Sequence, residues 1–156
     1  EVRAARVLEE VSADRPGALL LIDIDNFKPV NDLHGHIAGD QLLITLSETI
    51  RSVLPKGALA ARLGGDEFAI LLSHASCERI EAISSALREQ FHQAATEGFP
   101  TPLPVTLSIG ANLFDQPPGS LAVLIEQVDK VLYDSKRSGR DALRMVDQPR
   151  VTGQAS

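Results

Sequence analysis

The chain is poor in the features that define several common classes of protein. It has a single cysteine, Cys77, in 156 residues, which excludes an internal disulfide framework and a cysteine-rich zinc site and is typical of a reducing compartment. Its apolar runs fall short of the roughly 20 residues that cross a bilayer, and no signal-peptide pattern opens it. We therefore expect a cytoplasmic segment without a membrane span, although the full protein could be membrane-bound outside it.

Basic side chains are also scarce. The chain has 15 Lys and Arg against 21 Asp and Glu, which gives a net charge of −6. A nucleic-acid-binding face normally carries a basic stripe, so we expect no nucleic-acid partner. Any phosphate chemistry in this chain must depend on a few local cations and on metal ions.

The hydrophobic content of 44% and its periodicity predict one α+β domain over residues 1–146, followed by a tail or linker at 147–156. The apolar run 18–24 stops at carboxylates and predicts a buried central strand, and residues 31–35 are predicted to form a loop. We expect further strands at 58–63, 68–73, 105–113 and 142–146, and helices at 1–13, at 36–54, after an N-cap at Ser76, and from about 121 to a stop at Gly139. The β-α-β-β-α-β core is a ferredoxin-like arrangement, with helices on one face of a central, mostly antiparallel sheet.

Two short segments carry most of the functional information. Residues 21–28 read Leu-Ile-Asp-Ile-Asp-Asn-Phe-Lys, and residues 64–68 read Gly-Gly-Asp-Glu-Phe. Each places carboxylates at the end of an apolar strand, namely Asp23 in the first segment and Asp66 with Glu67 in the second. Mg²⁺ prefers oxygen ligands and usually takes one or two carboxylates plus substrate phosphates. If the hairpin strands lie beside the first strand, these carboxylates could hold two ions that clamp an attacking and a leaving oxygen.

The residues around these carboxylates suit a phosphate ligand. Gly64 and Gly65 allow the backbone to approach a ligand that a Cβ would block. Lys28 lies a few residues past the first strand, where it can meet phosphate oxygens. Strand-end aspartates and a Gly-Gly-Asp turn are also ordinary turn chemistry. Two such segments in the right relative order favour a metal-bound triphosphate site over that alternative.

Beyond these two segments, the chain resembles the GGDEF domain, the catalytic domain of diguanylate cyclases, over nearly its whole length. The resemblance is carried by spaced motifs in the expected order: 23–32 (Asp-Ile-Asp-Asn-Phe-Lys-Pro-Val-Asn-Asp), Gly35-His36 followed by Gly39-Asp40, 62–68 (Arg-Leu-Gly-Gly-Asp-Glu-Phe), 106–110 (Thr-Leu-Ser-Ile-Gly), Leu132-Tyr133, Lys136 and Gly139-Arg140. It implies a palm-like, nucleotidyl-cyclase-like fold and the condensation of two GTP into cyclic di-GMP with release of two pyrophosphates. It also implies Mg²⁺ or Mn²⁺, two ions per active site, a homodimer for turnover, and a sensor or adjoining signalling domain outside this chain.

The resemblance implies roles residue by residue. Asp66 and Glu67 are the implied catalytic residues, and Asp66 matches the position linked to deprotonating the attacking 3′-hydroxyl. The implied metal ligands are Asp23, the carbonyl of Ile24, Asp66 and Glu67, whereas Asp25 matches a position that is not a primary ligand. The implied substrate contacts are Asn31 and Asp40 on the guanine edge, Lys28, Lys136 and Arg140 on phosphates with the backbone amides near Asn26 and Phe27, and Gly64 and Gly65 at the hairpin. An acidic acceptor at Asp40 suits the N–H donors of guanine, which adenine lacks there.

The chain departs from the family pattern in two places. Many members carry an Arg-x-x-Asp product-binding site shortly before the glycines, but residues 55–58 read Pro-Lys-Gly-Ala. We therefore predict that the primary feedback site is absent. The usual opening motif, Asp-x-Leu-Thr-Gly-Leu-x-Asn-Arg-Arg, does not appear either, so we expect the N-terminal edge of the domain to be truncated.

Other interpretations of these residues and of the domain are less favoured. We interpret His34, His36 and Cys77 as structural residues rather than as metal ligands or a reactive thiol. The main alternative function is a catalytically silent GTP-binding regulatory module that controls an adjoining domain, although the intact Asp66-Glu67 pair favours an enzyme. A cyclic di-GMP receptor is disfavoured by the missing Arg-x-x-Asp, and an adenine-using variant is disfavoured by Asp40.

Overall fold

The computed structural model describes residues 2–147, so the predicted tail lies almost wholly outside the described residues. The elements are, in order, α1 (Val2–Glu9), β1 (Gly17–Asp25), α2 (Phe27–His34), α3 (His36–Val53), β2 (Leu59–Gly64), β3 (Glu67–Leu72), α4 (Cys77–Glu97), β4 (Thr106–Phe114), α5 (Leu121–Arg137) and β5 (Leu143–Met145). The strands form one sheet in the order β2-β3-β1-β4-β5, in which β4–β5 is the parallel pairing. The predicted α+β class and the mostly antiparallel central sheet are confirmed.

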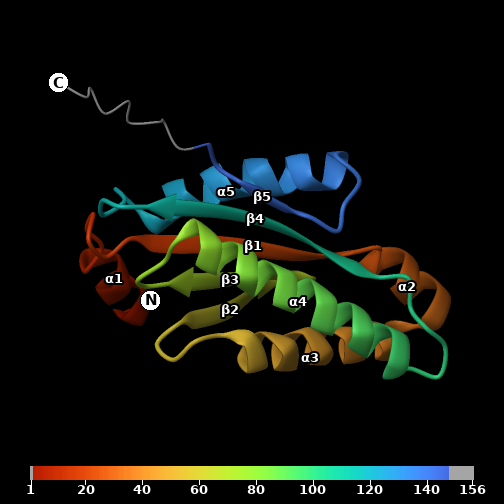
Figure 1. Cartoon of the computed structure of the whole chain (residues 1–156). Helices are drawn as coiled ribbons and strands as arrows, with labels where there is room; N and C mark the ends of the chain where they lie inside the picture. The colour runs from red at the N-terminus through yellow and green to blue at the C-terminus, as the bar shows by residue number, and fades with distance from the viewer. Residues whose placement is uncertain (1, 148–156) are drawn as a thin grey trace.

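The central strand β1 is buried on both faces because its side chains alternate between two cores. Leu20 and Ile22 belong to the core under α3 and α4, whereas Leu19 and Leu21 belong to a second core under α5. Helices flank the sheet as predicted, but they cover both of its faces rather than the one face expected: α3 and α4 cover one face, and α5 covers the other (Figure 1). A strand buried on both faces reads as a continuous apolar run. Asp23 continues the odd-numbered series and so faces α5.

The segment that follows β1 is helical, so the predicted loop at 31–35 is wrong. The helix α2 runs to His34, and Gly35, with φ 86°, separates it from α3. Pro29 is tolerated because it falls in the first turn, where the backbone N–H has no helical partner. Because Gly35 separates the two helices, the sequence pattern indicated a loop at 31–35, where the end of α2 lies.

The ends of the two long helices follow the sequence signals. The Ser76 Oγ accepts a hydrogen bond from the backbone N–H of Arg79 at 3.1 Å, which confirms the predicted N-cap of α4. Helix α5 ends at Arg137, and Gly139 follows with φ 115°, a conformation that glycine adopts readily. Over residues 2–147 the structure has no helix with the length and apolarity needed to cross a membrane.

A close contact between α5 and β4 sets the position of the functional end of α5. A Cβ added at Gly110 would lie 2.8 Å from the carbonyl oxygen of Val128 and 2.9 Å from the backbone nitrogen of Leu132. Glycine therefore lets the helix backbone approach the sheet. One turn beyond Leu132, Lys136 reaches the end of β1 and pairs with Asp23.

Candidate active site

The predicted carboxylates converge at one end of the sheet. Strands β1 and β3 are antiparallel neighbours with Asp23 directly opposite Glu67, so both side chains leave the same face. Asp66 precedes Glu67 at the tip of the β2–β3 hairpin, and its carboxylate lies close to that of Asp23. The condition set by the sequence, that the hairpin lies beside the first strand, is met.

Asp23 is a largely buried carboxylate with an incomplete set of partners. Its side chain is 13% exposed, and its Oδ2 pairs with the Lys136 ammonium. Within the described part of the chain its buried Oδ1 has no hydrogen-bond partner. Burial raises the pKa of Asp23 to about 6, and Asp66 adds to the rise because it accepts a hydrogen bond from the protonated form only. The ionised form would be stabilised by a further cation.

Burial and the nearby charges also shift the pKa values of the two neighbours of Asp23, Glu67 and Lys136. Burial raises the pKa of Glu67, and the negative charges of Asp129 on α5 and of Asp23 raise it further. Burial lowers the pKa of Lys136, but the hydrogen bond to Asp23 and the surrounding carboxylates outweigh this effect, so the pKa of Lys136 is raised. Lys136 is therefore a cation at neutral pH, set among carboxylates. Sequence reasoning missed Asp129, which no motif singled out.

The donor set suits a hard divalent cation. Among residues 2–147, no three His, Cys, Asp or Glu side chains are gathered closely enough to form a metal site by themselves. The carboxylates of Asp23 and Glu67 nevertheless offer oxygen ligands on one face, and the buried Oδ1 of Asp23 is unpartnered in this region. Mg²⁺ usually takes one or two carboxylates and completes its shell with water and substrate phosphates. A site with few protein ligands fits such an ion.

The hairpin tip is open around its two glycines. Gly64 and Gly65 have φ of 152° and 51°, and a Cβ at either position would meet nothing within 4 Å. Arg62 fixes the turn, because its Nε donates to the carbonyl oxygen of Gly65 at 2.9 Å. The glycines therefore supply the backbone shape of the turn and leave the space beside it free.

The turn between β1 and α2 holds the other predicted phosphate contacts. Asn26 has a left-handed backbone (φ 63°), and its Nδ2 donates to the carbonyl oxygen of Pro104 at 3.1 Å. Its side chain does not cap α2, so the amides around Phe27 point from a helix N-terminus without a side-chain acceptor, as a phosphate site requires. Lys28 pairs with Asp32 at 3.0 Å on an exposed face and must leave that partner to reach a phosphate.

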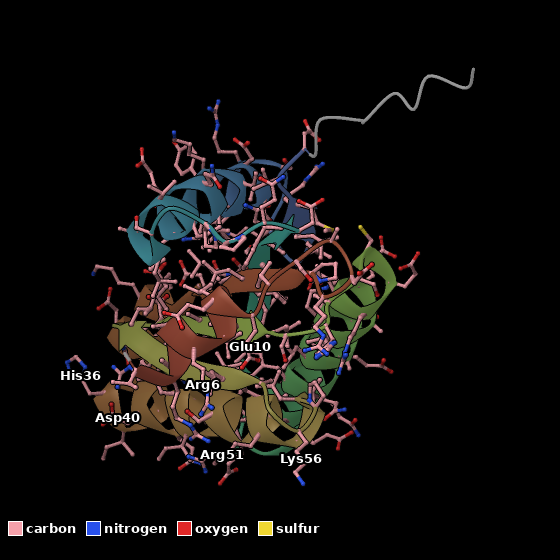
Figure 2. All side chains as sticks on the ribbon, turned by 90° about the vertical axis from the view of Figure 1, so that its left-hand side faces the viewer. Arg6, Glu10, His36, Asp40, Arg51 and Lys56 are labelled. Atoms are coloured by element: carbon pink, nitrogen blue, oxygen red, sulfur yellow. The ribbon has the colours of Figure 1, made fainter. Side chains whose placement is uncertain are left out.

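The predicted guanine contacts lie on adjacent helices. Asn31 of α2 packs so closely on Gly39 of α3 that a Cβ at position 39 would lie 1.8 Å from the Asn31 Oδ1. That Oδ1 is buried, with no partner among residues 2–147. Asp40 follows Gly39 and is exposed near His36 at the start of α3 (Figure 2). The glycine thus brings the Asn31 amide to the helical turn that carries Asp40.

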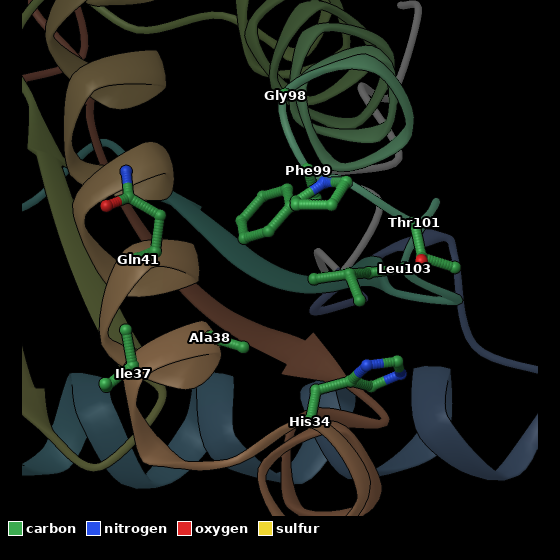
Figure 3. A pocket seen from close by; sticks show the side chains of 9 residues that line it. His34, Ile37, Ala38, Gln41, Gly98, Phe99, Thr101 and Leu103 are labelled. Atoms are coloured by element: carbon green, nitrogen blue, oxygen red, sulfur yellow. The ribbon is translucent and has the colours of Figure 1, made fainter.

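Two hollows lie near these helices. Asp40 lines a depression of about 460 Å³ with Arg51 and Arg62, and Arg62 connects it to the hairpin tip through its bond to Gly65. A second hollow of about 510 Å³ lies between α3 and the α4–β4 connection (Figure 3). His34 lines the second hollow together with Gln41 and Phe99.

Asp25 is the main functional candidate that sequence reasoning did not develop. Its side chain is buried, with the residue 3% exposed. Its Oδ1 accepts from the Ser108 hydroxyl at 2.7 Å, and its Oδ2 accepts from the Thr106 hydroxyl at 2.6 Å and from the backbone N–H of Asp141 at 3.1 Å. These donors satisfy the carboxylate within the protein. Residues 105–109 alternate between apolar and polar side chains, with Thr106 and Ser108 on the polar face of the strand. This alternation was the signal that could have revealed the two hydroxyls as partners of Asp25.

Comparison with known proteins assigns the family. The family model described as "Diguanylate cyclase, GGDEF domain" matches residues 2–142. Diguanylate cyclase A of Treponema denticola is 34% identical over 128 residues, which cover 82% of this chain and 34% of that protein. Diguanylate cyclase TpbB of Pseudomonas aeruginosa strain UCBPP-PA14 is 35% identical over 160 residues, which cover 97% of this chain and 36% of that protein. The chain belongs to the GGDEF family and spans about a third of the length of these curated relatives.

Solved structures agree with this assignment. The active GGEEF domain of a diguanylate cyclase from Vibrio cholerae matches with a TM-score of 0.81 and 28% identity, over 95% of this chain and 92% of that chain. The GGDEF domain of DgcB from Caulobacter crescentus, in complex with c-di-GMP, matches with a TM-score of 0.81 and 27% identity, over 94% and 88% of the two chains. The fold that the resemblance implied is confirmed.

Proposed function

We propose that this domain is a diguanylate cyclase, which condenses two GTP molecules into cyclic di-GMP and two pyrophosphates. The observation that carries the proposal is the convergence of Asp23, Asp66 and Glu67 at one end of the sheet, with Lys136 against them. These residues come from three separate segments of the chain. Carboxylates that lay far from one another in the fold would not support metal-assisted phosphoryl transfer.

The reaction is two identical transfers. In each, the 3′-oxygen of one GTP forms a bond to the α-phosphorus of the other, the bond from that phosphorus to the bridging oxygen of the β-phosphate breaks, and pyrophosphate leaves. Asp66, at the exposed hairpin tip, accepts the proton of the 3′-hydroxyl. Lys136 and Arg140 bind phosphate oxygens together with the first amides of α2. Asn31 and Asp40 hydrogen-bond the guanine edge.

Metal binding fits the carboxylate cluster. Asp23, the carbonyl of Ile24, Asp66 and Glu67 would hold Mg²⁺ or Mn²⁺, two ions per site, and the bound ions would neutralise charge that develops on the phosphate oxygens. Lys136 stabilises the Asp23 carboxylate before a cation arrives. Once Asp23 has another positive partner, the Lys136 ammonium is free to turn to a phosphate.

The chemistry requires two copies of the domain. Each copy binds one GTP, and two copies face each other so that each 3′-hydroxyl lies in line with the α-phosphorus of the other nucleotide. One copy alone binds GTP and cannot complete the product. Control of dimerisation by a sensor or adjoining domain is then control of activity.

The test is incubation of the purified domain at high concentration with GTP and Mg²⁺, followed by chromatography for cyclic di-GMP. We expect product from the parent and none from Asp66→Ala. An artificial dimerising fusion is assayed in parallel, so that a fragment that fails only to dimerise is recognised. GTP binding without product in the fusion would establish the silent regulatory module instead, and absence of GTP binding would refute both functions.

A further inference from the structure

The segment between α5 and β5 has a strained backbone. Gly139, Arg140 and Asp141 all have positive φ, at 115°, 63° and 43°. Two successive residues with side chains rarely occupy this region, and they do so only where their surroundings enforce it. Such strain is concentrated at functional sites, so the groups that enforce it here are informative.

One restraint comes from the α5 face of the sheet. The buried Asp25 carboxylate accepts the backbone N–H of Asp141 through Oδ2 at 3.1 Å. The hydroxyls of Thr106 and Ser108 hold the same carboxylate at 2.6 Å and 2.7 Å. Asp25 is therefore a fixed acceptor, and the N–H of Asp141 must lie where this acceptor can reach it.

The second restraint comes from α4 on the opposite face. The Arg88 Nη1 donates to the carbonyl oxygen of Asp141 at 2.9 Å and lies 3.5 Å from its Oδ1. The Arg88 side chain is 31% exposed, so it contributes a partly desolvated charge-assisted bond. The two polar groups of one peptide segment, the N–H and the C=O of Asp141, are thus held from the two sides of the sheet.

Further hydrogen bonds tie this segment back to α5. The Arg140 N–H donates to the carbonyl oxygen of Ser135 at 3.1 Å, and the Ser135 hydroxyl donates to the carbonyl oxygen of Ala142 at 3.0 Å. The Arg140 side chain remains exposed, and no ion pair involves it within residues 2–147. The backbone of Arg140 is therefore fixed while its guanidinium is available to a ligand.

We propose that Arg88, with Asp25, is a positioning residue for nucleotide binding: the two hold the main chain of Asp141 and so direct Arg140 to the phosphates beside Lys136. This inference rests on the proposed function, because it takes nucleotide phosphates as the ligand of Arg140. Arg88 itself lies on α4, whose helix packs on the other face of the sheet, and it does not contact the nucleotide.

The test is a double-mutant cycle on GTP affinity, measured by calorimetry with Mg²⁺ at a domain concentration at which no product accumulates. Arg140→Ala removes one charge-assisted contact and should weaken binding roughly tenfold. Arg88→Met keeps the aliphatic stem but removes the donor, and should weaken binding to a similar extent. The double variant should be no weaker than Arg140→Ala, because Arg88 acts only through Arg140.

A matched control is available on the same helix. The Arg79 Nη1 donates to the carbonyl oxygen of His74 at 3.0 Å, far from residues 139–141 in the sequence. Arg79→Met therefore removes a similar main-chain contact and should leave GTP affinity unchanged. Arg88→Lys restores a charged donor and should recover most of the affinity.

The outcomes separate this inference from the proposed function. Additive losses of GTP affinity in the cycle, or unchanged GTP affinity in either Arg88→Met or Arg140→Ala, would overturn the inference.

Amide exchange gives a readout that needs no nucleotide: the Asp141 amide should exchange faster in Arg88→Met while β1 amides stay protected. Should Arg88→Met unfold, Arg88→Gln takes its place in both measurements.

Two outcomes distinguish the inference from the proposed function. If the losses of GTP affinity are coupled but the fused dimer forms no cyclic di-GMP, the inference stands and turnover is refuted. If the parent domain does not bind GTP, both the inference and the proposed function are overturned.

Discussion

Asp23→Asn should make the metal-free domain more stable at pH 8 while it removes activity. The Asp23 carboxylate is largely buried beside Asp66, and this environment raises its pKa from 3.8 to about 6. An asparagine has nearly the same shape and no charge, so the folded state no longer contains an ionised group in an unfavourable site. Active-site groups commonly lower stability in this way.

The size and pH range of the effect follow from the pKa change. The folded state binds the Asp23 proton more tightly than the unfolded chain does, so protonation contributes stability below pH about 3.8 that is lost as the pH rises to about 6. The full loss is about 3 kcal/mol at 1.36 kcal/mol per pKa unit. Asp23→Asn also removes the partner of Lys136, which reduces the gain. We expect the variant to be about 1 to 3 kcal/mol more stable at pH 8 and close to the parent at pH 4.

Asp25→Asn is the matched control, on the same strand and the same face two residues away. Each oxygen of the Asp25 carboxylate already has a donor: Oδ1 accepts from the Ser108 hydroxyl, and Oδ2 accepts from the Thr106 hydroxyl and from the backbone N–H of Asp141. An asparagine keeps the shape but weakens charge-assisted bonds, so this variant should be about 1 kcal/mol less stable. The two substitutions should therefore change stability in opposite directions at pH 8.

The assay is urea unfolding of the parent and the two variants in EDTA at pH 4 and pH 8, repeated at pH 8 with saturating Mg²⁺ and GTP. Bound ligand should stabilise the parent by mass action and leave Asp23→Asn nearly unchanged, which would reverse their order. A variant Asp23→Asn that is less stable than the parent at pH 8 in EDTA would refute the reasoning, because the carboxylate would then be a net stabilising group.

Three further predictions concern specificity, feedback and packing. Asp40→Ser should relax the preference for GTP over ATP, measured as the ratio of kcat/KM values, because an acceptor for guanine N–H donors is lost; an unchanged ratio would undermine the guanine assignment. Residues 55–58 lack the charges of the Arg-x-x-Asp site, so Lys56→Ala should leave inhibition by cyclic di-GMP unchanged; tight inhibition that this substitution abolishes would contradict the prediction. Gly110→Ala should destabilise the domain by about 1 to 3 kcal/mol in urea unfolding and lower activity, because the new Cβ would lie 2.8 Å from the Val128 carbonyl oxygen and push α5 with Lys136 outward; a neutral result would show that α5 adjusts freely.

Sequence reasoning succeeded where the structure depends on neighbours in the chain. The apolar run at 18–24, the Gly64-Gly65 turn and the Ser76 cap are all local features, and each element formed as predicted. It failed at 31–35, because Gly35 hid the end of α2, whose first turn accommodates Pro29. It also failed on helix placement, since a continuous apolar run shows that a strand is buried without showing which helix covers each face.

The sequence by itself determined the family, the succession of the strands along the chain and the carboxylates that could bind a metal, because these follow from residue identity and short spacing. Only the tertiary structure decided that Lys136 pairs with Asp23 and that Asp25 holds the Asp141 amide. The first contact joins residues that lie 113 positions apart in the sequence, and the second joins residues that lie 116 positions apart. Neither periodicity nor motif spacing carries information over such separations. The contacts arise because Gly110 lets the backbone of α5 lie close to the sheet, and because groups on both faces of the sheet hold the strained turn after α5.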